Sequence, residues 1–159
     1  MLLNFNVIVM TTDLSDYSLR ALPYAVGLAE RFDARLKILC INEPALPVAD
    51  AAWGGFDVRA TDNALLDEAR QALDRIVREK VPRGVPVEAT VVTGNAVDAI
   101  IDFARDQNAD LLVMCTHGRT GLSHVLMGST AEAVVRRAPC PVLTLRQPMP
   151  VGGAAPRGT

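Results

Sequence analysis

The stretches Asn6-Val-Ile-Val-Met10 and Leu111-Leu-Val-Met-Cys115 decide the fold of this chain. Both are short and, after Asn6, continuously apolar, which is typical of strands covered by helices on both faces. A half-exposed strand would instead alternate apolar and polar residues. These two stretches therefore predict a parallel sheet buried inside an α/β domain.

Outward from these stretches, five strand candidates alternate with four helical patterns. The first helix carries apolar residues every third or fourth position, and Pro23 is predicted to kink it. A later helix is predicted to begin at Asn95 as its cap, with Asp98 as its third helical residue. The strands are predicted at Phe5–Met10, Arg35–Ile41, Val87–Val92, Leu111–Thr116 and Val142–Arg146.

Strict alternation of strands and helices indicates right-handed βαβ units and a doubly wound, five-stranded parallel sheet. The 159 residues fit one domain, which we place at 1–147. Residues 148–159 are rich in Pro, Gly and Ala, and we expect them to form a disordered tail. The chain contains no internal repeat.

Composition excludes several classes of protein. The net charge of −2 leaves no broad basic field for nucleic acid or for an anionic membrane surface. Three cysteines without a CxxC pair indicate neither a disulfide framework nor a zinc knuckle, and suit a reducing compartment. The sequence shows neither a signal peptide nor an apolar run of about 20 residues, so we expect a cytoplasmic protein.

Ligands of doubly wound sheets bind at the carboxyl ends of the strands, where the strand order reverses. For an order of 3-2-1-4-5, the ends of the first and fourth strands meet there. Thr11-Thr-Asp-Leu-Ser15 follows the first strand, and Thr116-His-Gly-Arg-Thr-Gly121 follows the fourth. The long connection 42–60 leaves the same edge of the sheet, and its Trp53 and Phe56 suit a minor core, a lid or a partner surface equally.

The segment 115–130 has the chemistry of a phosphate site. Glycines allow close approach of backbone N–H groups, Arg119 adds a cation, and Gly128-Ser-Thr130 opens a helix whose N-terminus attracts anions. A second interpretation needs no ligand, because Ser129 and Glu132 have the spacing of a capping box. The residues alone leave both interpretations open.

The stretch from Met114 to Leu145 resembles the C-terminal signature of the universal stress proteins, and Thr12-Asp-Leu-Ser15 agrees with their start. The resemblance covers about 5–146. It implies a flavodoxin-like order of 3-2-1-4-5, similar to adenine nucleotide alpha hydrolases, and a stress-response role. It also implies a homodimer that pairs through the last strand, formed here by Val142, Leu143, Thr144 and Leu145.

Part of that family binds ATP through the pattern G-x₂-G-x₉-G-[ST]. Gly118, Gly128 and Ser129 match its second, third and final positions, whereas Cys115 replaces the first glycine. Either the backbone at Cys115 is β-like and tolerates a side chain, or the side chain narrows the pocket. The resemblance implies ATP, with or without magnesium or manganese, as the ligand.

The resemblance also assigns residues outside that pattern. Asp13 matches an acidic residue near the adenine and ribose, Ile41 a small apolar wall, and Thr11 stands where many members have proline. For Asp13 a plain alternative is electrostatics at the start of a helix, with Ser15 or Asp16 as its cap. The other nucleotide-binding candidates are Thr12, Met114, His117, Arg119 and Thr130.

Other chemistries fit less well. A response-regulator phosphoacceptor needs an acceptor after the third strand and a lysine after the fifth, where this chain has Thr93-Gly94 and Arg146-Gln147. His117 and His124 lack a third metal ligand at a suitable spacing, and Cys115 lacks an evident base. We find no Walker lysine or kinase loop, so hydrolysis of ATP should be slow at most.

Three functions therefore remain. The first is an ATP-binding regulatory protein, and the second is a nucleotide-free dimeric module that binds an unidentified protein partner. The third is a slow ATPase.

Overall fold

The computed structural model describes residues 4–43, 58–116 and 127–146, with side chains from residue 63 onward in the second of these ranges. Five parallel strands form one sheet in the order β3-β2-β1-β4-β5, which confirms the predicted fold. The strands are β1 (Val7–Thr12), β2 (Arg35–Asn42), β3 (Val87–Thr93), β4 (Leu111–Cys115) and β5 (Val142–Leu145).

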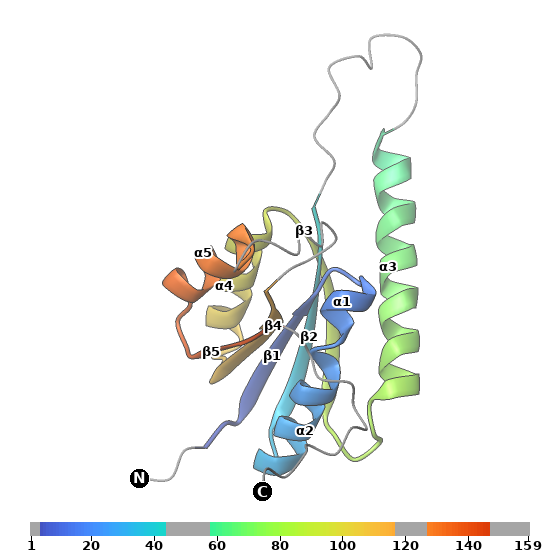
Figure 1. Cartoon of the computed structure of the whole chain (residues 1–159). Coiled ribbons are helices and arrows are strands. Elements are labelled where there is room, and N and C mark those ends of the chain that lie inside the picture. The colour runs from blue at the N-terminus through green and yellow to red at the C-terminus, as the bar shows by residue number, and fades with distance from the viewer. Residues whose placement is uncertain (1–3, 44–57, 117–126, 147–159) are drawn as a thin grey trace, which may run out of the picture.

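Helices cover both faces of the sheet, as its apolar strands require (Figure 1). One layer holds α1 (Asp16–Leu19), α2 (Leu22–Phe32) and α3 (Val58–Lys80). The opposite layer holds α4 (Ala96–Asp106) and α5 (Ser129–Arg137).

Each layer encloses its own hydrophobic core. Alternate residues of β1 point to opposite faces, so Ile8 and Met10 pack beneath α2 and α3 while Val7 and Val9 pack beneath α4 and α5. Ile8, Val9 and Met10 are fully buried. The central strand therefore anchors both cores, and its carboxyl end is held in place from both sides.

The first strand is longer than predicted. We expected it to end at Met10, but Thr11 and Thr12 continue it and pair in register with Leu39 and Cys40 of β2. Both threonines are buried, and their β-branched side chains suit an extended backbone. The candidate residues Thr11 and Thr12 thus belong to the strand itself and not to the loop after it.

The first helical region is interrupted earlier than predicted. We expected one helix kinked at Pro23, but α1 ends at Leu19 and α2 begins at Leu22. Pro23 lies in the first turn of α2, where a missing N–H breaks no intrahelical hydrogen bond. The kink prediction is therefore wrong: Pro23 helps to start α2 and does not bend it.

Other expectations at this level are mixed. Asn95 caps α4 as predicted, because its side chain accepts a hydrogen bond of 3.2 Å from the N–H of Asp98. Cys40 is buried, but Cys140 is only partly so. α3 begins at Val58, inside the connection predicted to reach residue 60. Trp53, Phe56 and the tail 148–159 lie outside the described residues.

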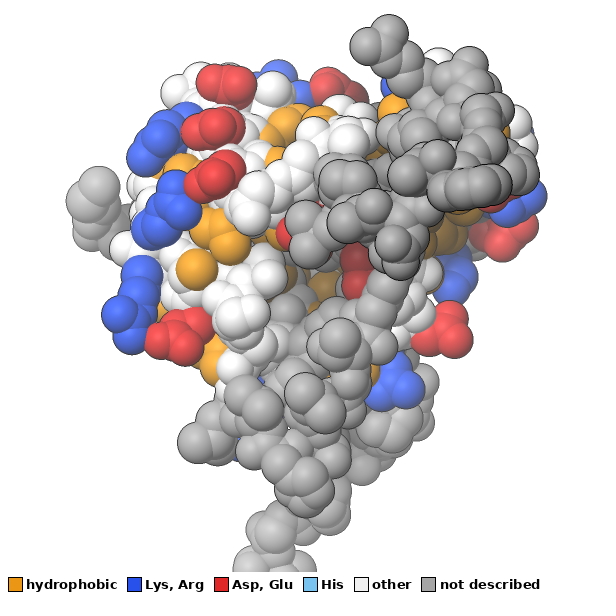
Figure 2. Space-filling view, turned by 90° about the horizontal axis from the view of Figure 1, so that it is seen from above, with side chains coloured by type: hydrophobic (Ala, Val, Ile, Leu, Met, Phe, Trp, Pro, Cys, Tyr) orange, Lys and Arg blue, Asp and Glu red, His pale blue; other side chains and the backbone are white. Residues whose placement is uncertain are grey.

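The visible charged surface is mixed in sign. Figure 2 shows Lys and Arg side chains interspersed with Asp and Glu along one side of the face seen from above. On α5, Arg136 pairs with Glu132 at 2.7 Å, and Arg137 reaches Asp98 of α4 at 2.8 Å. Within the three described ranges, none of the helices is both long and apolar enough to cross a bilayer.

Candidate functional site

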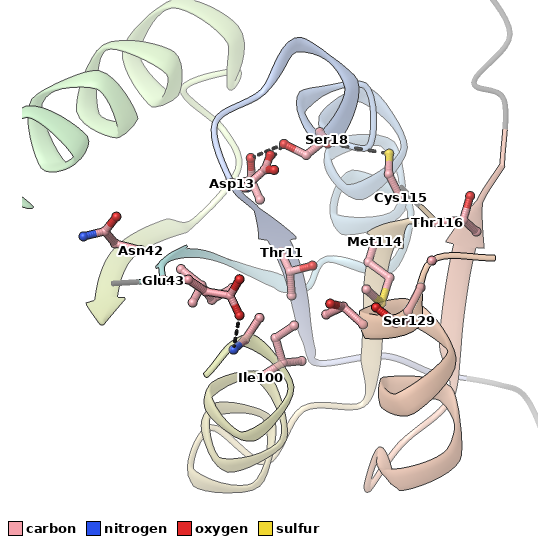
Figure 3. Close-up of a pocket in the computed structure, with 16 residues that line it drawn as sticks. Thr11, Asp13, Ser18, Asn42, Glu43, Ile100, Met114, Cys115, Thr116 and Ser129 are labelled. Carbon is pink, nitrogen blue, oxygen red and sulfur yellow. Dashed lines mark hydrogen bonds between the residues drawn. The ribbon is translucent and has the colours of Figure 1, made fainter. Parts of the chain in front are cut away.

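A pocket of about 490 Å³ opens at the carboxyl ends of β1, β2 and β4, between the N-termini of α4 and α5 (Figure 3). This is the switch point of the sheet, because β1 is followed by α1 on one face and β4 leads to α5 on the other. Its volume is typical of small-molecule sites. The lining residues are Thr11, Thr12, Asp13, Ser18, Ile41, Asn42, Glu43, Ala96, Ile100, Met114, Cys115, Thr116, Gly128, Ser129, Thr130 and Ala131.

The α5 end of the pocket has the properties of an anion site. Gly128 is the N-cap residue of α5 and has no side chain with which to cap the first N–H groups of the helix. The predicted capping box of Ser129 and Glu132 is wrong, since the helix begins one residue earlier than that pattern requires. Ser129 is instead the first helical residue and lines the pocket.

The position of Gly128 is set from two directions. Its N–H donates to the carbonyl of Thr116 at 2.8 Å, and its own carbonyl accepts the first helical bond of α5, from Glu132, at 2.9 Å. The N–H of Thr116 in turn donates to the carbonyl of Leu145 in β5 at 3.1 Å. The start of α5 is thereby fastened to the ends of β4 and β5.

A tight turn joins β1 to α1 at the upper side of the pocket in Figure 3. Leu14 has a φ of 63°, a left-handed conformation that is uncommon for leucine. The hydroxyl of Thr12 stabilises this turn, because it accepts from the N–H of Leu14 at 3.0 Å and bonds to the hydroxyl of Ser18 at 2.7 Å. Thr12 therefore shapes the turn through its side chain.

Asp13 both stabilises the turn before α1 and lines the pocket. Its carboxylate accepts from the N–H of Ser15 at 3.0 Å and also from the Ser15 hydroxyl. Ser15 in turn caps α1, by accepting from the N–H of Ser18 at 3.2 Å. The alternative that Ser15 caps this helix is confirmed, and it places the Asp13 carboxylate at the pocket without excluding a ligand role.

Cys115 lies on the opposite face of β4 from the apolar wall of the pocket. Its thiol donates to the carbonyl of Tyr17 at 3.2 Å and lies 3.7 Å from that of Ser18, beneath α1 (Figure 3). Met114, its neighbour in β4, packs on the other face. Of the two alternatives for this position, the extended backbone that tolerates a side chain is the one observed.

Burial also determines the ionisation of this thiol. Desolvation raises the pKa of Cys115 to about 11, outweighing the backbone hydrogen bond of Ala21 and the charge of Arg20, which both lower the pKa. At neutral pH the group is a protonated thiol, which is a poor nucleophile. This environment argues against a nucleophilic role for Cys115.

Apolar side chains form the middle of the pocket. Ile41 from β2, Met114 from β4 and Ile100 from α4 belong to one hydrophobic cluster, on the face covered by α4 and α5. At the α4 end, Glu43 accepts a hydrogen bond of 3.0 Å from the N–H of Ala96, the first residue of that helix. The pocket therefore has an apolar middle, a carboxylate at one end and helix N–H groups at the other.

The pocket contains nine of the predicted site residues: Thr11, Thr12, Asp13, Ile41, Met114, Cys115, Gly128, Ser129 and Thr130. His117, Gly118 and Arg119 lie outside the described residues. Seven lining residues were not predicted: Ser18, Asn42, Glu43, Ala96, Ile100, Thr116 and Ala131. Glu43 directly follows β2, so its place at the carboxyl end of a strand could have identified it.

Potential metal ligands do not cluster in the part of the chain that the structure describes. Among residues 4–43, 58–116 and 127–146, no three His, Cys, Asp or Glu side chains gather where they could hold an ion. Both histidines lie in the segment between the last two of these ranges.

The fold and site together define a doubly wound α/β domain with a ligand-sized pocket at its switch point. The chain belongs to the universal stress protein family, whose model matches residues 4–146. A universal stress protein of Methanocaldococcus jannaschii is 34% identical over 144 residues, which cover 91% of this chain and 84% of that protein.

Solved structures share this fold. UspA from Lactobacillus plantarum is 24% identical, with a TM-score of 0.68 over 91% of this chain and 100% of its own. A universal stress protein crystallised in complex with cAMP is 29% identical, with a TM-score of 0.60 over 91% of this chain and 98% of its own.

Proposed function

We propose that this protein is an ATP-binding regulatory protein of the stress response, which works in the cytoplasm and changes its shape or partners with nucleotide occupancy. One observation carries the proposal: a single pocket joins an apolar slot to the N-terminus of α5. An adenine nucleotide has the same division, with a flat ring at one end and phosphates at the other. The relative crystallised with cAMP adds support, because cAMP also is an adenine nucleotide.

In the proposed complex the phosphates lie against the start of α5. The N–H groups of Ser129, Thr130 and Ala131 are the first three of that helix and have no partner within it. The hydroxyls of Ser129 and Thr130 add further donors, and the helix dipole favours negative charge there. Gly118 and Arg119 remain proposed phosphate contacts from the neighbouring segment, and His117 remains a proposed nucleotide contact.

The base and ribose occupy the remainder of the pocket. Ile41, Ile100 and Met114 provide apolar walls for the ring, and the carboxylate of Asp13 is an acceptor for ribose hydroxyls. In Figure 3 the hydroxyl of Thr11 lies between Asp13 and Ile100. In this proposal, magnesium or manganese is bound by the phosphate oxygens of ATP.

A thermal melt tests the proposal. A ligand that binds only the folded state stabilises it by about 2.7 kcal/mol when present at 100 times its Kd. We expect the melting temperature of the full chain to rise progressively with ATP up to millimolar concentrations, with and without magnesium. An unchanged melting temperature at millimolar ATP would contradict the proposal and favour the nucleotide-free module.

A negative charge introduced at the start of α5 should weaken nucleotide binding without destabilising the protein. Ser129→Glu places a carboxylate in the first turn, which the helix dipole favours by about 0.3–1 kcal/mol. The same carboxylate repels phosphate, so we expect ATP binding to fall by at least about 100-fold while the ligand-free protein melts no earlier than wild type. Ser129→Ala, which only removes a hydroxyl, is the matched control and should weaken binding about tenfold or less. Equal affinity of Ser129→Glu and wild type would place the phosphates elsewhere.

We further propose that the protein is a homodimer that pairs through β5. This strand is the edge of the sheet next to β4, and its four residues are all partly exposed. A short apolar edge strand needs cover, because its unpaired backbone groups otherwise bind other chains. A second copy of the same strand could supply that cover and leave other surfaces to the unidentified protein partner.

A further inference from the structure

We propose that Glu43 is a specificity-determining residue that recognises the 6-amino group of the adenine base. This inference rests on the proposed nucleotide function and adds to it the residue that distinguishes one purine from another. It is drawn from the position of the Glu43 carboxylate in the pocket.

Glu43 directly follows β2, which ends at Asn42. It lines the pocket together with Ile41, and its bond to the N–H of Ala96 places its carboxylate at the start of α4. Ile41 forms an apolar wall, and Glu43 continues that wall to the rim of the pocket. Figure 3 shows its carboxylate turned toward α4 and lying on the side of the pocket opposite Ser129.

One hydrogen bond fixes the orientation of this carboxylate. Oε1 accepts from the N–H of Ala96 at 3.0 Å, which joins the end of β2 to the first residue of α4. Ala96 and Ile100, one helical turn apart, both line the pocket beside it. Among the residues that the structure describes, Oε2 of this carboxylate has no hydrogen-bond partner, so it is an acceptor at the edge of the apolar slot.

The chemistry of an ionised carboxylate selects the ligand group. It accepts hydrogen bonds and donates none. With the phosphates at α5, the edge of the base that carries the exocyclic group points toward the opposite end of the pocket, where Glu43 lies. The amino group of adenine donates to such an acceptor, whereas a purine without that amine leaves the carboxylate facing the ring nitrogen, another acceptor.

Asp13 does not duplicate this role. The β1–β2 register ends with Thr12 opposite Cys40, so Asp13 directly follows that last pair, whereas β2 continues to Asn42 before Glu43. Asp13 approaches from the β1–α1 turn, whereas Glu43 borders α4. The two carboxylates thus face different parts of a nucleotide, the ribose and the far edge of the ring.

The experiment compares ATP with purine riboside 5′-triphosphate, which lacks only the 6-amino group, by calorimetric titration of the full chain. We expect wild type to favour ATP by about tenfold or more, the value of a hydrogen bond to a charged group. Glu43→Ala should bring the ratio of the two dissociation constants close to one. Glu43→Gln keeps an oxygen for Ala96 but offers an N–H₂ donor to the ring, so its ratio should fall to one or invert.

A control variant distinguishes recognition of the base by Glu43 from stabilisation of the start of α4. Asn95→Ala removes the other cap of this helix, which costs about 1 kcal/mol of stability, and should leave the wild-type ratio intact. A ratio that stays at its wild-type value in both Glu43 variants would overturn the inference. The inference would also be overturned if the Glu43 variants lost a preference for ATP over 2′-deoxy-ATP and kept the preference for ATP over the triphosphate without the 6-amino group. Glu43 would then contact the ribose and not the base. Absence of ATP binding by wild type would instead overturn the proposed function, and this inference with it.

Discussion

At the scale of single residues, Cys115 determines how the pocket is understood. The family pattern for ATP binding has glycine there, which suggests that a side chain would intrude. Because Cys115 occupies an extended strand, its thiol lies beneath α1, where it donates to the carbonyl of Tyr17, while the residue also borders the pocket. We therefore expect the replacement of glycine to affect the packing beneath α1 more than the width of the pocket.

Introducing the glycine of the family pattern at position 115 tests this interpretation. Cys115→Gly removes a buried side chain and loosens a strand, so we expect the free energy of unfolding to fall by about 2 kcal/mol in urea titrations. The affinity for ATP should stay within about threefold of wild type, because the thiol is turned toward the carbonyls of Tyr17 and Ser18. A large gain in affinity would mean that the cysteine blocks the site, as the nucleotide-free alternative requires.

The Cys115 thiol also predicts a dependence of stability on pH. Its pKa is raised from 9.0 to about 11 in the folded protein, chiefly by burial. The thiol's contribution to stability is complete below about pH 9 and is lost between about pH 9 and 11, where the unfolded chain ionises first. The free energy of unfolding of wild type should therefore fall more steeply over this range than that of Cys115→Ala. Identical slopes for the two proteins would show that burial does not hold this thiol neutral.

At the scale of elements, the strands were predictable and several junctions were not. Apolar runs such as 111–115 indicate buried strands whatever surrounds them, whereas the sheet order, and with it the switch point, followed from the resemblance to the family. The break at residues 20–21 could not, because neither Arg20 nor Ala21 disfavours a helix and tertiary packing decides the division. Glu43 resembles an ordinary solvated charge until its bond to Ala96, distant in sequence, is seen.

The edge strand β5 carries a prediction of its own. Residues 141 and 145 offer their carbonyls to β4, so the backbone groups of Val142 and Thr144 point away from that neighbour. Thr144→Pro removes one outward N–H and leaves the bonds to β4 in place. We expect wild type to sediment as a dimer and Thr144→Pro as a monomer with the same far-ultraviolet spectrum. A dimer that survives the proline would place the interface on another surface.

At the scale of the whole molecule, the pocket lies where the two cores meet. Its β1–α1 turn is anchored in the core beneath α2 and α3, while its apolar walls belong to the core beneath α4 and α5. A ligand that bridges these parts can bias how the two layers sit against each other. This arrangement is consistent with the proposed regulatory response to nucleotide.

The turnover itself can be predicted. No Lys or Arg is found among the pocket-lining residues that the structure describes, so stabilisation of a transferring phosphoryl group by such a cation must come from elsewhere. We expect ATP hydrolysis below about 0.01 s⁻¹, which is a thousandfold under the median enzyme. Release of labelled phosphate checks this, with Ser129→Glu as the background. Turnover near 10 s⁻¹ that Ser129→Glu abolishes would identify an enzyme.

Calorimetric titration of ATP into the full-length wild-type chain tests the central claim most directly. We predict saturable binding of one ATP per chain, lost in Ser129→Glu and retained in Cys115→Gly. Absence of saturable binding at millimolar ATP, or equal binding by wild type and Ser129→Glu, would contradict the assignment of this pocket to a nucleotide.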